Sequence, residues 1–132
     1  MKRFAFAIML AGALVIFSGA LAMAGGVRAS KTEAAVSFDE PTKLLGVILK
    51  GQYLFVHDDE RMARGEDCTY VYNYTDGKQG DLLVSFHCIP VPRQKANQFT
   101  VTVTMVPGTN LYELVEYRFA GSDEGHRVPA GK

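Results

Sequence analysis

The stretch from Cys68 to Cys88, CTYVYNYTDGKQGDLLVSFHC, constrains the fold more than any other part of this chain. Two runs rich in tyrosine, valine and leucine flank the segment 76–80, DGKQG, whose aspartate and glycines suit the positive φ angles of a tight turn. This pattern predicts a β-hairpin. Its outer ends carry the only two cysteines among the 132 residues.

Symmetric pairing of the two strands about Lys78 would place Cys68 opposite Cys88. Because side chains alternate along a strand, both cysteines then share one face with six aromatic or aliphatic residues. These are Tyr70, Tyr72, Tyr74, Leu82, Val84 and Phe86. A slip of one residue would separate the cysteines, so the cysteines and the aromatic pattern select the same register. We expect this face to be the core face, with His87 on the more polar opposite face.

Residues 1–24 have the features of a secretory signal peptide. Lys2 and Arg3 precede the apolar run 4–17, and a small-x-small cleavage pattern follows it. An uncleaved membrane anchor is the competing interpretation, since the apolar run reaches Ala24, but the small residues near its end favour cleavage. We therefore predict an exported protein, periplasmic or secreted, with no membrane span in the mature chain.

Export changes the interpretation of the cysteines. In an oxidising compartment, two cysteines in one mature chain usually pair. We therefore predict a disulfide between Cys68 and Cys88 that staples the hairpin. A closed loop of this length would stabilise the fold by about 3 kcal/mol on the chain-entropy model.

The rest of the chain divides into a flexible lead (25–42), a single β-domain (43–120) and a polar tail (121–132). Within the domain, the pattern predicts several short strands and one helical turn over residues 58–65. This element list is typical of an all-β fold, a small antiparallel β-sandwich or open barrel. Fourteen basic residues balance fourteen acidic ones without a basic cluster, so nucleic acid is a poor partner.

Three residues could form a metal site. If their strands are neighbours, His57, His87 and the Asp58 carboxylate would converge on copper or zinc. The alternative is that each histidine is an ordinary strand-end residue with local hydrogen bonds. The sequence has no HxH, HxxxH or HExxH spacing, so we predict no cofactor in the first instance.

No catalytic group is predicted. Ser122, Asp123 and His126 have the residue types of a hydrolytic triad, but they crowd a short glycine-bounded tail with no scaffold to orient them. We interpret this segment as a solvated turn. The GxSxG, P-loop and GxGxxG motifs are also missing from the sequence.

Four phrases, FVHDD, EDCTYVY, LVSFHCxPxxR and EYRFAG, resemble those of small exported bacterial proteins without an assigned function. The resemblance implies export and a shared fold, and it carries no catalytic residue to this chain. Our first hypothesis is a non-enzymatic exported β-domain that binds a protein or cell-envelope component through a sheet face or edge. The second is a periplasmic metal-binding protein that uses His57 and His87, and the third is a small hydrolase.

Overall fold

The computed structural model describes residues 31–130. This part of the chain is mostly β, with one short helix, which confirms the predicted fold class. The elements are β1 (Lys31–Leu44), β2 (Val47–Asp58), α1 (Asp59–Ala63), β3 (Thr69–Thr75), β4 (Lys78–Phe86), β5 (Ile89–Pro92), β6 (Thr100–Met105), β7 (Tyr112–Arg118) and β8 (Glu124–Arg127).

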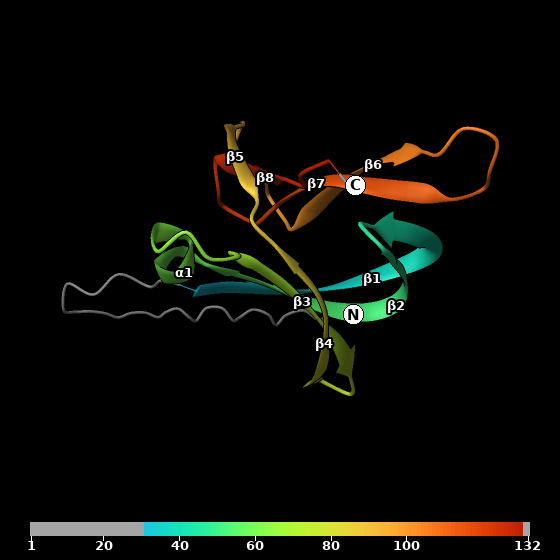
Figure 1. The fold of residues 1–132 in the computed structure, drawn as a ribbon, viewed down its shortest axis with the longest axis horizontal. Coiled ribbons are helices and arrows are strands. Elements are labelled where there is room, and N and C mark those ends of the chain that lie inside the picture. The colour runs from blue at the N-terminus through green and yellow to red at the C-terminus, as the bar shows by residue number, and fades with distance from the viewer. Residues whose placement is uncertain (1–30, 131–132) are drawn as a thin grey trace, which may run out of the picture.

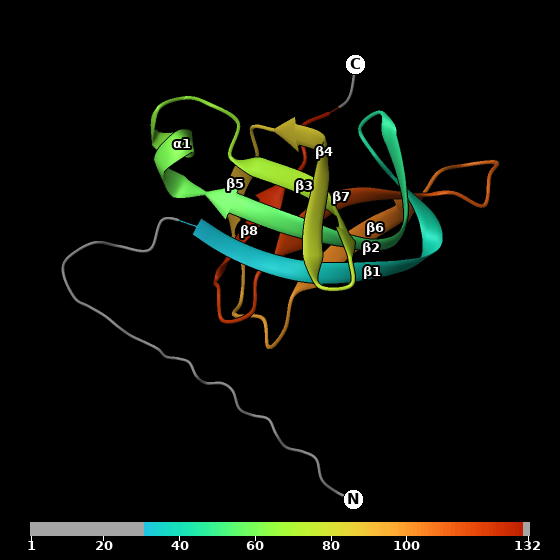
Figure 2. The ribbon, with the colours of Figure 1, turned by 90° about the horizontal axis from the view of Figure 1, so that it is seen from below.

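All of these strands belong to one open, mixed sheet with the order β4-β3-β2-β1-β7-β8-β5, and β6 pairs with β7. The sheet folds over on itself, so that β1 to β4 form one layer and β5 to β8 the other (Figure 1). Figure 2 shows β3, β2 and β1 side by side, with α1 at the end of β2. The layers join where Thr42 and Lys43 of β1 pair in parallel with Tyr112 and Glu113 of β7.

The core lies between the two layers. Phe55 of β2 is fully buried and meets the ring of Tyr117 of β7 edge-on, with ring centroids 5.4 Å apart. Phe99 and Phe119 extend this aromatic cluster, and Leu114 is buried beside it. Burial of these large side chains from both layers supplies the apolar area that stabilises the packing of one layer on the other.

The predicted flexible lead is wrong from residue 31 onward, because residues 31–44 form strand β1. Ala34, Val36 and Phe38 alternate toward the core, and small alanine makes this period-two signal weak. Pro41 lies where the pairing with β2 shifts register, a position that tolerates a residue without an N–H. The predicted signal peptide, 1–24, and the start of the lead, 25–30, lie outside the described residues.

The hairpin is present, but its predicted register is wrong. Asp76 and Gly77, with φ angles of 53° and 74°, form a tight two-residue turn, so the ladder is not centred on Lys78. Val71 pairs with Val84 and Thr69 with Phe86, and two register shifts follow toward the turn.

This register turns over the face of β3 but not that of β4, where Phe86 is buried and Val84 packs against the core as predicted. Thr69 and Val71 are fully buried, whereas Tyr70, Tyr72 and Tyr74 are half-buried on the opposite face. The predicted tyrosine core face is therefore wrong. Cys68 and Cys88 nevertheless meet, because both lie just beyond the ladder, where the Cys68 N–H donates to the Phe86 carbonyl at 3.1 Å.

The predicted helical turn is confirmed and the predicted polar tail is partly wrong. The Asp58 carboxylate caps α1, and Gly65 follows its end with φ of 81°. Within the tail, residues 124–127 form β8, which pairs with both β5 and β7 and buries His126. No helix within residues 31–130 is long and apolar enough to cross a membrane.

Candidate metal centre

Three side chains from distant parts of the chain meet at one end of the sandwich. They are His57 at the end of β2, Cys88 between β4 and β5, and His126 in β8, each at most 4% exposed. One ligand atom of each lies within 4.8 Å of the others. Within residues 31–130 this is the only group of three or more histidine, cysteine or acidic residues with such spacing.

The Cys88 sulfur lies close to one nitrogen of each imidazole. It is 3.4 Å from His57 Nε2 and 3.6 Å from His126 Nδ1. The imidazole rings face each other, with centroids 4.2 Å apart and planes inclined by 35°. Two nitrogens and one sulfur therefore lie close together, all within 4.8 Å of one another.

Strand pairing accounts for this convergence. His57 pairs with Thr69, the residue after Cys68, which places the end of β2 against the cysteines. On the other layer, His126 pairs with Tyr117 of β7 and with Pro90 of β5, so the start of β5 brings Cys88 to β8. The centre thus joins β2 of the first layer to β8 of the second.

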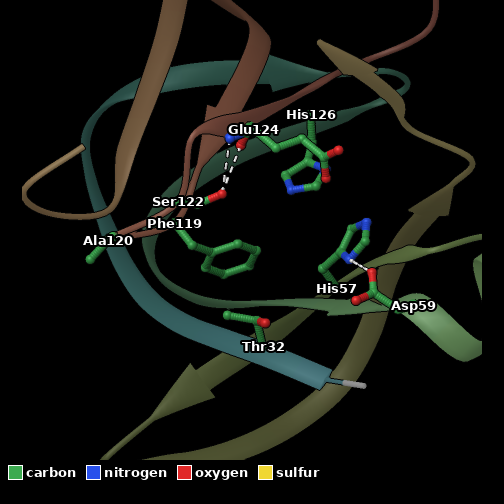
Figure 3. A pocket seen from close by; sticks show the side chains of 9 residues that line it. Thr32, His57, Asp59, Phe119, Ala120, Ser122, Glu124 and His126 are labelled. Carbon is green, nitrogen blue, oxygen red and sulfur yellow. Dashed lines mark hydrogen bonds and ion pairs between the residues drawn. The ribbon is translucent and has the colours of Figure 1, made fainter. Parts of the chain in front are cut away.

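Neighbouring groups orient both imidazoles. His57 Nδ1 lies 3.1 Å from a carboxylate oxygen of Asp59 (Figure 3). This leaves Nε2 on the side of Cys88. His126 stacks on the ring of Tyr117, with centroids 5.0 Å apart, and the Tyr117 hydroxyl is hydrogen-bonded to Thr69. A carboxylate that holds the far nitrogen of a histidine is the common support of histidine metal ligands.

Burial keeps the histidines neutral and the cysteine protonated. It lowers the pKa of His57, and burial together with the neighbouring His57 lowers the pKa of His126 to about 4. Burial, and to a smaller extent the hydrogen bond with Cys68, raises the pKa of Cys88 to about 12. Neutral imidazoles have the free lone pair that a metal needs, whereas the thiol must release its proton on binding.

The predicted disulfide is not formed in the structure. Cys68 and Cys88 are both buried free thiols, and their sulfurs are 2.6 Å apart, against about 2.05 Å in a disulfide. The Cys88 N–H also donates to the Cys68 sulfur at 3.1 Å. The predicted contact between the two cysteines is therefore present, but hydrogen bonds rather than a covalent bond connect them.

Only one member of the predicted metal set, His57, lies at the centre. The Asp58 carboxylate accepts hydrogen bonds from the backbone N–H groups of Glu60 and Arg61, as a helix cap. His87 is exposed, and its Nδ1 lies 2.9 Å from the Glu66 carbonyl. His57, Asp58 and His87 therefore do not converge, and the expectation that they share one ion is wrong.

Cys88 and His126 take the places that the sequence interpretation gave to His87 and Asp58. Residues 57, 88 and 126 are far apart in sequence and no short spacing motif joins them, so only the strand order could have revealed the group. Ser122 and Asp123 do not join His126 in a triad. The Ser122 hydroxyl exchanges hydrogen bonds with the backbone of Glu124, and Asp123 is exposed.

A pocket of about 230 Å³ opens beside the two histidines. Thr32, Ser122 and the backbone around Ala120 form its rim, and the carboxylates of Asp59 and Glu124 flank the imidazoles (Figure 3). The pocket gives a water-sized species a path from solvent to His57 and His126. Two carboxylates on this path favour a cation over an anion.

Comparisons of the chain with protein-family models, with curated proteins and with solved structures found no match.

Proposed function

We propose that this protein binds one transition metal ion, zinc or copper(I), through His57 Nε2, Cys88 Sγ and His126 Nδ1. One observation carries the proposal, the separation of 3.4 and 3.6 Å between the Cys88 sulfur and the two nitrogens. Tetrahedral zinc holds sulfur at about 2.3 Å and imidazole nitrogen at about 2.0–2.1 Å, which places the two ligand atoms about 3.6 Å apart. Both sulfur–nitrogen separations thus suit an ion of this size.

The chemistry of the ligands selects the class of metal. One thiolate and two imidazoles suit zinc and copper(I), whereas magnesium and calcium require oxygen ligands. Asp59 supports His57 from behind, and the pocket beside Asp59 and Glu124 offers an entry path. A ligand set, an outer support and an entry path are the elements that a metal-binding site needs.

Metal titration of the reduced protein tests the proposal. We expect one zinc ion per chain in a competition with a chromophoric chelator, and a thiolate-to-metal charge-transfer band with cobalt(II) as the spectroscopic substitute. Cys88→Ser should remove the band, because it deletes the thiolate, and His126→Ala should weaken cobalt binding, because it deletes an imidazole ligand. His87→Ala is the matched control and should retain the band, since His87 is exposed and away from the centre. Unchanged cobalt binding by Cys88→Ser would refute the proposal.

Binding of a protein or cell-envelope component through a sheet face, our first hypothesis from the sequence, stays a prediction. The half-buried face with Tyr70, Tyr72 and Tyr74 is the surface that favours it, because tyrosines are enriched at protein interfaces. Export of the chain also stays a prediction. A metal site at the opposite face of the hairpin is compatible with both.

A further inference from the structure

Cys68 lies directly behind the metal ligands and has no part in the proposed coordination. Its side chain is fully buried, and its sulfur touches that of Cys88 at 2.6 Å. It does not belong to the group of ligand atoms that lie within 4.8 Å of one another. A second buried thiol in contact with a metal ligand requires an explanation of its own.

Shared coordination does not explain the position of Cys68. Two thiolates on one tetrahedral zinc ion lie about 3.8 Å apart, given zinc–sulfur bonds of about 2.3 Å. The sulfurs here are more than 1 Å closer than that, and about half an ångström from the length of a disulfide bond. The pair is therefore arranged for bonding to each other rather than for binding one ion together.

We propose that Cys68 and Cys88 are an oxidisable thiol pair whose disulfide form excludes the metal ion. This inference rests on the proposed function, since it assigns the Cys88 sulfur two competing roles. As a thiolate, Cys88 completes the set with His57 and His126. As half of a disulfide, its sulfur is neutral and a poor ligand, and two imidazoles alone remain.

A peroxide is an oxidant of suitable size for this buried pair. One thiol gives up its proton and the sulfur attacks hydrogen peroxide; the O–O bond breaks and the proton joins the departing hydroxide, so that a sulfenic acid and one water form. The second thiol then attacks the sulfenic sulfur, the S–S bond forms, and a second water leaves. The two sulfurs lose two electrons in total, which reduce one peroxide to two waters. The pocket at His57 and His126 leads to the side chains that contact Cys88.

The two states can be compared in the wild-type chain. Metal-free reduced protein treated with hydrogen peroxide should lose about 2 Da in intact mass, since two hydrogens leave. Zinc-loaded protein should be protected, because the ion occupies the Cys88 sulfur. The oxidised protein should show no thiolate-to-cobalt band until a phosphine reductant restores it. An oxidised protein that binds cobalt with an unchanged band would overturn the inference.

Removal of Cys68 separates the inference from the proposed function. Cys68→Ala should bind cobalt one-to-one with the wild-type band, and peroxide should add 16 or 32 Da rather than remove 2. Loss of the band in a folded Cys68→Ala variant would make Cys68 a ligand, which overturns the inference and leaves the metal site standing. If the reduced wild-type protein showed no band, the proposed function and the metal part of the inference would both fail. The wild-type comparison needs no variant and remains decisive if Cys68→Ala does not fold.

Discussion

Asp59 determines which nitrogen of His57 faces the metal centre. The His57 Nδ1–H donates to its carboxylate, so that Nε2 keeps its lone pair toward Cys88. Asp59 itself is 68% exposed and adds nothing to the core. It therefore acts on the site through orientation and charge rather than through packing.

Replacement of Asp59 should therefore weaken metal binding without unfolding the protein. We expect Asp59→Ala to reduce zinc affinity by about 10- to 100-fold, as measured by chelator competition. The zinc affinity of Asp59→Asn should lie between those of the wild type and Asp59→Ala, because an amide oxygen still accepts the imidazole N–H. Glu60→Ala is the matched control, an exposed acidic neighbour in the same helix. Equal losses in Asp59→Ala and Glu60→Ala would point to general charge and would contradict the orienting role.

At the scale of the elements, the position of β8 depends on how closely its backbone packs against a neighbouring ion pair. Arg93 and Glu116 form a bidentate pair, with nitrogen–oxygen distances of 2.8 and 2.7 Å. Gly125 packs directly against it, and a Cβ at this position would overlap the Glu116 carboxylate. The strand that carries His126 therefore depends on a residue without a side chain.

Gly125→Ala should destabilise the fold and loosen the metal site together. We expect a loss of about 1–3 kcal/mol in the free energy of unfolding by urea, the usual cost of an overpacked site. Zinc affinity should fall as well, because His126 follows Gly125 directly. Gly46→Ala is the control, since a Cβ there meets nothing within 4 Å. If Gly125→Ala kept the wild-type stability, β8 would be able to shift away from the ion pair. The requirement for glycine at position 125 would then be refuted.

The sequence predicted some elements and missed others for identifiable reasons. The hairpin of β3 and β4 was predictable from its turn residues, and its cysteines from their positions. Its register was not predictable. The two-residue turn at Asp76 and Gly77 and the two register shifts change which residues pair, and the side-chain pattern does not indicate either feature. β1 and β8 were missed because alanine, glycine and charged residues give a weak strand period.

At the scale of the whole molecule, the metal centre is only partly predictable from the sequence. His57 was identified from its position at a strand end beside acidic residues. The partnership with His126 depends on β8 entering the sheet between β7 and β5, a long-range pairing that local patterns do not encode. The all-β class followed from many short strands, whereas the site followed from their order.

The metal ion should cross-link the two layers of the sandwich. His57 comes from β2 in one layer and His126 from β8 in the other, so an ion bound to both joins elements that unfolding must separate. A ligand that binds only the folded chain at 100 times its dissociation constant stabilises it by about 2.7 kcal/mol. For a domain of this size, each kcal/mol raises the melting temperature by about 4–8 °C.

We therefore expect excess zinc to raise the melting temperature of the reduced protein by about 10 °C or more. Cys88→Ser and the peroxide-oxidised protein should show little of this rise, while His87→Ala should show all of it. Differential scanning calorimetry with and without zinc measures the effect. An equal rise in the Cys88→Ser variant would place the stabilising ion elsewhere on the molecule. Because the oxidised protein has lost the Cys88 thiolate, and with it the ion that joins β2 to β8, its melting temperature should no longer respond to metal.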